Sequence, residues 1–203
     1  MPVILVANPK GGVGKSTIAT NLAGYFASRG FRTMLGDTDR QQSARSWLAL
    51  RPAGLRKIES WDVEDDGKVR APKGVSHAVL DSPAGLHGKR LAQLLKIADK
   101  VVVPLQPSMF DILATRDFLA QLAESGDSKK VGVVGMRVDA RTRAADQLHR
   151  FVDGLSLPVL GYLRDTQNYV QLAAHGLTLW DVAPGRVEKD LPQWGDLVAW
   201  LGK

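Results

Sequence analysis

A glycine-rich loop near the start of the chain constrains the fold more than any other feature of the sequence. Residues 8–17 read NPKGGVGKST; they follow the apolar run 3–7 and precede a helical pattern. Gly11, Gly12 and Gly14 lack a Cβ, so the backbone can turn its N–H groups inward around an anion. The helix after the loop adds the positive end of its dipole. A strand, a glycine-rich loop and a helix in this order predict a nucleoside triphosphate site.

The end of this loop supplies the polar groups that a triphosphate site needs. Lys15 is placed to reach the β- and γ-phosphates, and the Ser16 hydroxyl is placed to ligate Mg²⁺. Val13 and Thr17 complete the loop residues that we expect to contact the nucleotide. The structural alternative is an ordinary glycine-rich turn, which the preceding strand and the following helix disfavour.

Apolar strands and helical patterns alternate along the rest of the chain. The segments 78–80, 101–103 and 131–136 are wholly apolar, which is typical of parallel strands covered on both faces. Helices are expected over 16–29, 41–51, 110–124, 141–154 and 166–176, with Leu113, Phe118, Leu119 and Leu122 on the buried side of the third. The irregular segment 52–76 is expected to be a surface excursion that contains one strand near Ile58 and Trp61.

This alternation predicts the fold class. We expect an α/β fold, a doubly wound and mostly parallel sheet with helices on both faces. At 203 residues, the chain is long enough for one well-buried domain and short for two, so residues 1–203 are predicted to form a single P-loop domain.

Three aspartates end or follow apolar strands. Asp37, Asp39 and Asp81 occupy such positions, and ligands of this kind of sheet bind at the carboxyl ends of its strands. A carboxylate there can hold Mg²⁺ directly or through water, or orient a water in line with the γ-phosphate. The alternative role for each is a helix N-cap. Three such residues beside one phosphate loop favour the metal and catalytic roles.

The composition is that of a globular protein with a basic excess. Charged residues make up 24% of the chain and hydrophobic residues 44%. Because there is no cysteine, disulfides, Cys-ligated zinc and iron–sulfur clusters are excluded. No apolar stretch approaches the ~18 residues of a membrane span, so a cytoplasmic location is expected. The net charge of +6 favours a polyanionic partner.

The glycine-rich loop departs from the strict P-loop pattern in an informative way. Pro9 replaces the first glycine, and an extra lysine, Lys10, precedes the remaining ones. This form resembles the deviant Walker A loop of the ParA/MinD group of ATPases. The segments DTDRQ at 37–41, DSP at 81–83, VVPLQPS at 102–108 and AAHGL at 173–177 also match that group, in the same order. The resemblance covers nearly the whole chain and is greatest to the short, single-domain ParA/ParF-type partition proteins.

This resemblance implies a cofactor and roles for individual residues. The implied cofactors are ATP and Mg²⁺, with Lys10, Lys15 and Asp39 as catalytic residues. Lys10 would cross a dimer interface to the partner's nucleotide, and Asp39 would orient the attacking water. Asp37 would support the Mg²⁺ shell, and Asp81 would bind Mg²⁺ through water. The family resemblance therefore implies an ATPase that forms a homodimer when ATP is bound.

Two positions differ from the family pattern. Arg40 replaces the usual proline of the 37–41 switch, which changes its expected stiffness. Met136 stands where many relatives have an asparagine that reads adenine. The expected contacts of the base lie in the loops after Met136 and Leu163, at Met136, Arg137, Arg164 and Asp165.

DNA is the second ligand that the resemblance implies. In this family the ATP-bound dimer binds DNA without sequence preference, and Arg141, Arg143 and Arg150 lie on or beside one predicted helix. Contacts of arginines with phosphates are strongly salt-dependent and insensitive to sequence. A solvated helix face is the structural alternative, and the basic stretch 40–57 is a competing location. A nucleoid-associated protein with a ParB-like or other adaptor that stimulates hydrolysis is implied.

Three other functions remain open at this point. An ATP-dependent biosynthetic enzyme can use the same loop, but it needs a second set of catalytic groups. A nucleotide-locked module would bind without hydrolysis, against which Asp39 argues. A MinD-like membrane helix at the tail is disfavoured because Glu188, Asp190 and Asp196 would oppose an anionic surface, so no stable membrane association is expected.

Overall fold

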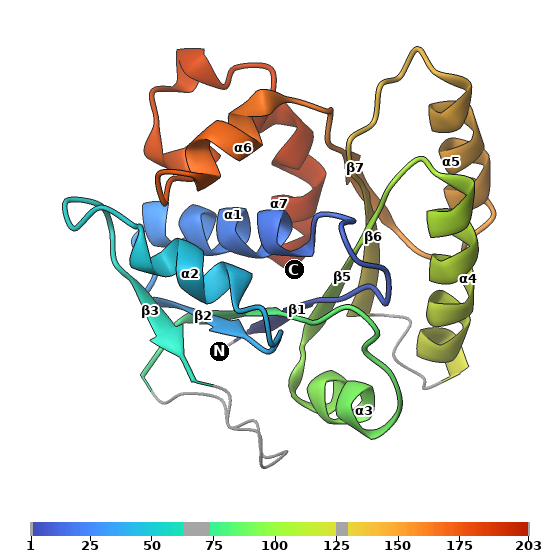
Figure 1. The fold of residues 1–203 in the computed structure, drawn as a ribbon, viewed down its shortest axis with the longest axis horizontal. Coiled ribbons are helices and arrows are strands. Elements are labelled where there is room, and N and C mark those ends of the chain that lie inside the picture. Colours follow the sequence, from blue (N-terminus) through green and yellow to red (C-terminus); the bar gives the residue numbers. More distant parts are fainter. Residues whose placement is uncertain (1, 63–73, 125–129, 203) are drawn as a thin grey trace.

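Seven strands form one parallel sheet in the part of the chain that the computed structural model describes, residues 2–62, 74–124 and 130–202. Their spatial order is β3-β2-β4-β1-β5-β6-β7, and every neighbouring pair is parallel (Figure 1). The strands are β1 Val3–Val6, β2 Thr33–Asp37, β3 Ile58–Trp61, β4 His77–Asp81, β5 Lys100–Leu105, β6 Val131–Gly135 and β7 Val159–Tyr162. The predicted strand near Ile58 is confirmed, whereas residues 63–73 of the predicted surface excursion lie outside the described residues.

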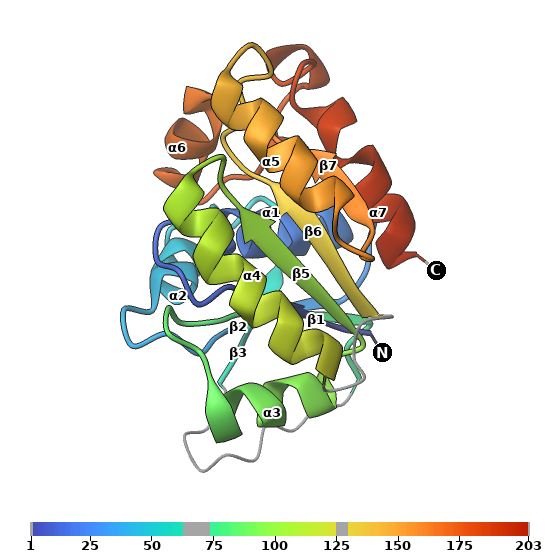
Figure 2. The same cartoon turned by 90° about the vertical axis from the view of Figure 1, so that its right-hand side faces the viewer.

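Helices cover both faces of this sheet. They are α1 Lys15–Ser28, α2 Ser43–Ala49, α3 Gly88–Ile97, α4 Met109–Glu124, α5 Arg143–Asp153, α6 Gln167–Ala173 and α7 Gly195–Leu201, with 3₁₀ turns η2 Leu179–Asp181, η3 Pro184–Arg186 and η4 Leu191–Trp194. Figures 1 and 2 show α3, α4 and α5 on one side of the sheet and α1, α2, α6 and α7 on the other.

Alternate residues of the central strand point into two separate cores. Val3 and Leu5 of β1 pack with α3, α4 and α5, whereas Ile4 and Val6 pack with α1, α2, α6 and α7. A strand buried on both faces has to be apolar at every position, which is why the strand segments lack polar alternation. The predicted doubly wound α/β fold is confirmed.

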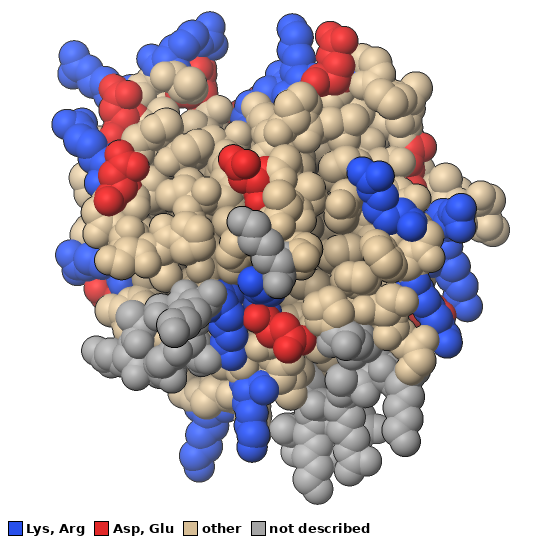
Figure 3. All heavy atoms as spheres, turned by 180° about the vertical axis from the view of Figure 1, so that it is seen from behind, with Lys and Arg blue, Asp and Glu red and all other residues tan. Residues whose placement is uncertain are grey.

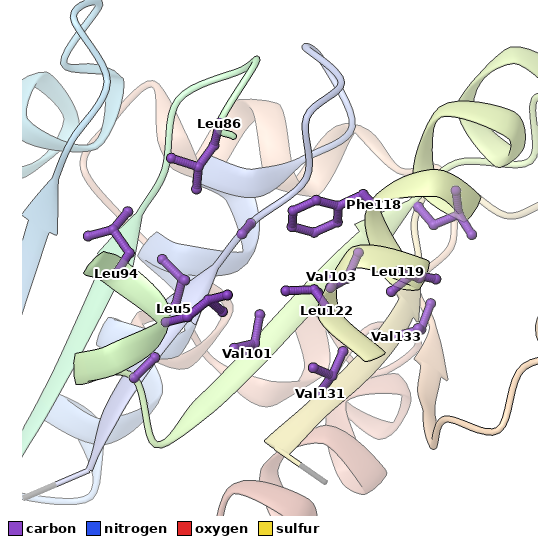
Figure 4. Packing of buried hydrophobic residues seen from close by; sticks show 14 of the residues in the cluster. Leu5, Leu86, Leu94, Val101, Val103, Phe118, Leu119, Leu122, Val131 and Val133 are labelled. Carbon is purple, nitrogen blue, oxygen red and sulfur yellow. The ribbon is translucent and has the colours of Figure 1, made fainter. Parts of the chain in front are cut away.

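Helix α4 corrects one predicted core residue. Figure 4 shows Phe118, Leu119 and Leu122 facing Val103, Val131 and Val133 of the sheet. Leu113 was expected on the same side, but its side chain is 42% exposed. The buried positions of α4 are 111, 112, 115, 118, 119 and 122, and position 113 falls outside that stripe of helical spacing.

The carboxyl ends of three neighbouring strands meet at one edge of the sheet. Asp81 at the end of β4 is level with Val6 at the end of β1 and with Asp37 at the end of β2. Because the glycine-rich loop leaves the sheet directly after Val6, this register brings the two aspartates beside the loop.

The segment after α6 packs closely on α1. Trp180 donates from Nε1 to the carbonyl oxygen of Asn21 at 3.0 Å, and the N–H of Leu179 donates to Asn21 Oδ1 at 3.1 Å. A Cβ on Gly24 would overlap the Thr178 side chain. Glycine at position 24 therefore permits the close approach of these two segments.

A buried ion pair joins the end of α2 to η2. Arg51 donates from Nη1 and Nη2 to the two carboxylate oxygens of Asp181, each at 2.8 Å, and both side chains are 6% exposed. Burial raises the pKa of Asp181, but hydrogen bonds from Arg51 and Thr178 outweigh it and hold that pKa below its ordinary value. Arg51 belongs to the basic stretch 40–57. Its side chain is paired with Asp181 inside the protein and is therefore not exposed to a ligand.

The described helices can be compared with a membrane span, and the tail helix with the predicted one. None of them is long and apolar enough to cross a bilayer. In the tail, α7 spans only Gly195–Leu201, and its Leu197 and Leu201 side chains are buried in the core.

Candidate nucleotide site

The buried side chain of Asn8 holds the start of the glycine-rich loop. Its amide nitrogen donates to the Pro104 carbonyl oxygen at 2.8 Å and to the Thr115 hydroxyl at 2.9 Å. Its Oδ1 accepts from the N–H of Lys10 at 2.8 Å. Asn8 is not among the predicted site residues, because two of its three partners lie 96 and 107 positions away in the sequence.

Two glycines give the loop its curvature. Gly12 and Gly14 have φ angles of 76° and 98°, in a region that strains residues with a Cβ. A Cβ on Gly14 would also lie 2.6 Å from Cε of Met136. The predicted base-contact residue Met136 therefore packs directly against the phosphate loop. Gln106 supports the loop from the other side by donating to the Gly12 carbonyl oxygen at 2.9 Å.

Lys15 is buried at the first position of α1, inside the loop. Its Nζ donates to the carbonyl oxygen of Lys10 at 2.8 Å, and the residue is 7% exposed. Burial lowers the pKa of Lys15, and the carboxylates of Asp81 and Asp39 partly oppose that shift. This cation lies at the centre of the loop, facing two acidic side chains.

Asp81 and Ser82 carry buried polar atoms without partners among the described residues. Both residues are 1% exposed, and Asp81 Oδ1 and Ser82 Oγ make no hydrogen bond there. Burial raises the pKa of Asp81 to about 7, although a hydrogen bond with Ser16 opposes the rise. Asp81 therefore has a carboxylate oxygen without a hydrogen-bond partner close to the Ser16 hydroxyl. These two oxygen ligands suit Mg²⁺, which usually binds one or two protein oxygens together with water and phosphate oxygens.

The predicted Mg²⁺ residues fit a metal site that is completed by a nucleotide. Among the described residues, no group of three His, Cys, Asp or Glu side chains is arranged to hold a metal ion alone. Mg²⁺ in nucleotide sites takes several ligands from substrate phosphates and water. Ser16 and Asp81 are therefore the residues that would hold it.

Asp37 organises the backbone that follows β2. Its Oδ1 accepts from the N–H of Asp39 at 2.9 Å, and its Oδ2 accepts from the N–H groups of Ala44 and Arg45 at 2.8 and 3.1 Å. The two bonds to Oδ2 satisfy free amides in the first turn of α2, although the N-cap residue of this helix is Gln42 and not Asp37. Gln42 has a φ of 50°, which explains why α2 begins at Ser43 and not at the predicted position 41.

A pocket of about 520 Å³ opens above the loop. It is lined by the loop residues Gly11, Gly12, Gly14, Lys15, Ser16 and Thr17 and by Asp39, Gln41, Ser43, Ser82, Ala84 and Arg137. Asp39 faces this pocket from the segment after β2, and its Oδ1 accepts from the Gln41 N–H at 3.0 Å. Val13, also predicted to contact nucleotide, is buried in the protein and does not line the pocket.

A second pocket, of about 630 Å³, adjoins the first. It brings together all four predicted base contacts, Met136, Arg137, Arg164 and Asp165, with Thr166, Gln167, Tyr169, Val170, Ala173 and Ala174. Gly14, Thr17 and Arg137 line both pockets. Arg137 has a φ of 52°, an uncommon conformation for a residue other than glycine. The two pockets suit the phosphates and the base of one nucleotide.

The Arg164 side chain is committed to a buried acid. Its Nε donates to Asp190 Oδ1 at 2.6 Å, and Asp190 is completely buried. Asn168 donates to the other oxygen of Asp190 at 2.6 Å. The N–H of Arg164 donates to Gln193 Oε1 at 2.9 Å. Arg164 therefore fixes the loop that borders the second pocket.

The Lys10 side chain forms an ion pair with α4 and does not line the pocket above the loop. Its Nζ lies 3.7 Å from Oδ1 of Asp111 in the first turn of α4, and its side chain is 45% exposed. Asp111 is 7% exposed. The extra lysine is therefore accessible and held by an acid of its own chain.

The arginines predicted to bind DNA differ in their surroundings. Arg141, Arg143 and Arg150 are exposed, but Arg141 is paired with Asp139 and precedes α5, whose N-cap is Thr142. The Arg141 hydrogen bonds hold the pKa of Asp139 at about 2. Figure 3 shows the back of the molecule, where Lys and Arg lie mostly around the margin, mixed with Asp and Glu. Charge alone does not select between α5 and the stretch 40–57.

Comparison with known proteins gives a family match over most of the chain. Residues 4–179 match the CobQ/CobB/MinD/ParA nucleotide binding domain. The chain is 30% identical over 190 residues to maintenance of carboxysome distribution protein A from Gloeobacter kilaueensis, covering 87% of this chain and 83% of the relative. It is 49% identical over 200 residues to chromosome partitioning protein ParA from Myxococcus xanthus, covering 75% and 70%.

A solved structure has the same fold. The complex of a Cyanothece McdA variant with ATP superimposes with a TM-score of 0.74 at 15% identity, covering 100% of this chain and 96% of the other. At that identity the likeness shows the fold alone. The family match and the curated relatives carry the assignment: the chain belongs to the CobQ/CobB/MinD/ParA nucleotide-binding domain family, among its ParA/MinD-type positioning and partition ATPases.

Proposed function

We propose that this chain is a ParA-like ATPase that dimerises with ATP, binds DNA without sequence preference, and hydrolyses ATP to position a cargo. The observation that carries the proposal is the pair of adjoining pockets at the strand ends. One is lined by Lys15, Ser16 and Asp39, beside the orphaned carboxylate of Asp81, and the other by the predicted base contacts.

Each residue of the first pocket has a task in phosphoryl transfer to water. Lys15 would compensate charge on the β- and γ-phosphates. Mg²⁺, held by Ser16 and through water by Asp81, would neutralise charge on the same oxygens. Asp37 supports that shell from β2. Asp39 would orient the attacking water, because this reaction needs a positioned nucleophile and charge stabilisation more than covalent chemistry.

Lys10 is the residue that we assign to dimerisation. Its ammonium is accessible and lies outside the pocket that its own loop forms. In the proposed dimer, it leaves Asp111 and reaches the nucleotide of the second copy. This arrangement would couple ATP binding to dimerisation, because the phosphates of the nucleotide in the second copy would replace Asp111 as the anionic partner of Lys10.

DNA binding is assigned to Arg141, Arg143 and Arg150. All three are exposed, and the net charge of the chain is +6. The curated relatives are named for chromosome partitioning and for carboxysome distribution. The proposed cargo is therefore a plasmid, a chromosome or a protein assembly. A ParB-like or other adaptor protein would stimulate ATP hydrolysis on the nucleoid.

The test is an ATP-dependent change of both assembly and DNA binding. Wild-type protein is passed over a sizing column with light scattering, with Mg²⁺ and either ATP, ADP or no nucleotide, and duplex binding is measured under the same conditions. Dimerisation and DNA retention with ATP only are expected. A chain that stays monomeric, or binds DNA equally in all three conditions, contradicts the proposal.

A further inference from the structure

Part of the second pocket, which would receive the base, is formed by side chains that make no strong hydrogen bond. Val170, Ala173 and Ala174 line it from α6 and from the residue after that helix. Met136 lines it directly after β6 and is 4% exposed. A thioether is only a weak hydrogen-bond acceptor, but it is polarizable and packs well against flat rings. These four residues therefore supply contact area that does not depend on which base is bound.

Three polar side chains of the same pocket are bonded within the chain. Nε of Arg164 donates to a buried carboxylate oxygen at 2.6 Å. The Thr166 hydroxyl oxygen accepts from the N–H of Asn168 at 3.3 Å, as the N-cap of α6. The Tyr169 hydroxyl accepts from Nε1 of the completely buried Trp194 at 3.0 Å. A base that used these bonded atoms would have to displace internal contacts.

Two backbone N–H groups at the pocket are also occupied. Met136 donates to the carbonyl oxygen of Leu105 at 2.8 Å, and Arg164 donates to Oε1 of Gln193 at 2.9 Å. These bonds hold the segments after β6 and β7 in place. The residues that border the base pocket on two sides thus spend these donors on the fold.

The other polar side chains of the pocket are exposed or shared with the phosphates. Thr17 also lines the first pocket, and Arg137, Asp165 and Gln167 are exposed. The Asp165 carboxylate could accept from the amino group of either purine, because adenine carries one at N6 and guanine one at N2. An exposed group that loses a base partner bonds to water in its place, so it rejects a wrong base only weakly.

We infer, on the basis of the proposed function, that this site accepts nucleoside triphosphates of both purines, adenine and guanine, and that Met136 makes it permissive. A site that hydrogen-bonds its substrate rejects an analogue without that bond by about 10⁴–10⁵, because buried polar groups are left unpaired, whereas an apolar site discriminates by about 10² or less. Met136 leaves no strong donor or acceptor unpaired with either base. Affinity would then come mainly from the triphosphate and Mg²⁺ in the first pocket.

The first test measures the binding of both purine nucleotides to wild type. Isothermal titration with Mg²⁺ and either AMPPNP or GMPPNP, the non-hydrolysable analogues of ATP and GTP, gives the two dissociation constants. They should agree within about tenfold, well below the discrimination of a hydrogen-bonding site. A larger preference for AMPPNP overturns the inference and leaves the proposed function intact. A larger preference for GMPPNP, or no binding of either nucleotide, overturns both.

The second test assigns the permissiveness to Met136. Met136→Asn places an amide at the pocket that can pair with N6 and N7 of adenine, whereas guanine presents two acceptors at the same edge. Met136→Leu is the matched control, because it keeps an apolar side chain of similar volume. Thermal melting without nucleotide shows whether each variant is folded.

The ratio of the two dissociation constants is compared between these variants. In Met136→Asn it should move at least about tenfold toward AMPPNP, whereas Met136→Leu should keep the wild-type ratio. Equal ratios in the two folded variants overturn the role of Met136. The wild-type ratio needs no substitution, so it decides whether the site is permissive independently of how Met136→Asn folds.

Discussion

Lys15 donates from Nζ to the carbonyl oxygen of Lys10, with 2.8 Å between the two atoms. The glycine-rich loop is thus closed on itself by the cation that would bind the phosphates. The ammonium is already oriented into the loop before any anion enters, so little side-chain freedom remains to be lost on binding.

Replacement of the two loop lysines should separate binding from assembly. Lys15→Ala removes the buried cation, so ATP binding and every later state should be lost. Lys10→Ala removes only the accessible one, so monomer binding should stay within a few-fold of wild type while dimerisation and hydrolysis fall. Equilibrium binding of a fluorescent ATP analogue, paired with light scattering, measures both effects. A Lys10→Ala protein that dimerises and hydrolyses normally would exclude the deviant-loop role.

The Arg51–Asp181 pair should contribute strongly to stability. Removal of one partner leaves a buried charge uncompensated, which typically costs about 3–5 kcal/mol. Asp181→Ala and Arg51→Ala should therefore lower the free energy of unfolding by that order in urea titrations, and the double variant Arg51→Met/Asp181→Leu should lose less than either. As a control, disruption of the exposed pair Arg32 and Glu59 should change little. If the loss of unfolding free energy in the double variant equalled the sum of the two single losses, Arg51 and Asp181 would not be energetically coupled.

Stability should also depend on pH through His77. Its ring stacks on Phe26 at 4.1 Å and contacts Phe31 at 4.4 Å between centroids. Burial lowers the pKa of His77 below 6.5, so the unfolded state takes up a proton first as pH falls. The contribution of neutral His77 to the free energy of unfolding is therefore fully present above pH 6.5. It is lost as the pH falls from 6.5 through the pKa of His77 in the folded state.

The matched variants for this pH effect are His77→Phe and His175→Phe. His77→Phe keeps an aromatic ring in the stack and should flatten the decline of the melting temperature between about pH 7 and 5. His175 is exposed, and its replacement should leave the slope unchanged. Identical slopes in wild type and His77→Phe would show that another group causes the decline.

Much of the site could be predicted because its residues are neighbours in sequence or end neighbouring strands. Lys15, Ser16 and Thr17 follow β1 after the short glycine-rich loop, and Asp37 and Asp81 end two other strands. Once apolar runs identify parallel strands, their carboxyl ends must meet at one edge. The same rule brings the predicted base-contact residues to one edge of the sheet, since Met136 follows β6 and Arg164 follows β7 closely.

What escaped prediction depends on packing between distant segments. Asn8 and Thr115 are 107 positions apart, and Arg51 and Asp181 are 130 apart, so no local pattern signals either contact. The sequence wrongly predicts Leu113 on the buried side of α4, because residue type alone cannot show which side of a helix with apolar residues on two sides is buried. The basic stretch 40–57 gives no sign that Arg51 is buried, because its acidic partner lies in another part of the sequence.

DNA binding should weaken without loss of basal hydrolysis when Arg141 and the α5 residues Arg143 and Arg150 are replaced. Arg141→Ala/Arg143→Ala/Arg150→Ala should weaken binding about equally for unrelated duplexes and flatten its salt dependence, because only phosphates are contacted. Affinity is measured by fluorescence anisotropy at several salt concentrations with ATP. Arg56→Ala/Lys57→Ala serves as the comparison, since it removes two exposed cations of the stretch 40–57. A loss in the comparison variant alone would move the DNA surface to that stretch.

The rate of ATP hydrolysis with and without the Asp39 side chain tests the central claim, an ATPase switch at this site, most directly. Mg²⁺-dependent phosphate release from ATP is measured in single turnover for wild type, Asp39→Ala and Lys15→Ala, with nucleotide occupancy determined in the same samples. Asp39→Ala should keep ATP bound, persist as a dimer, and hydrolyse about 10²-fold more slowly or worse, the scale of a lost positioned catalytic group. Lys15→Ala should neither bind nor hydrolyse. Wild-type hydrolysis in Asp39→Ala, or no Mg²⁺-dependent hydrolysis in wild type, would contradict an ATPase switch built on this site.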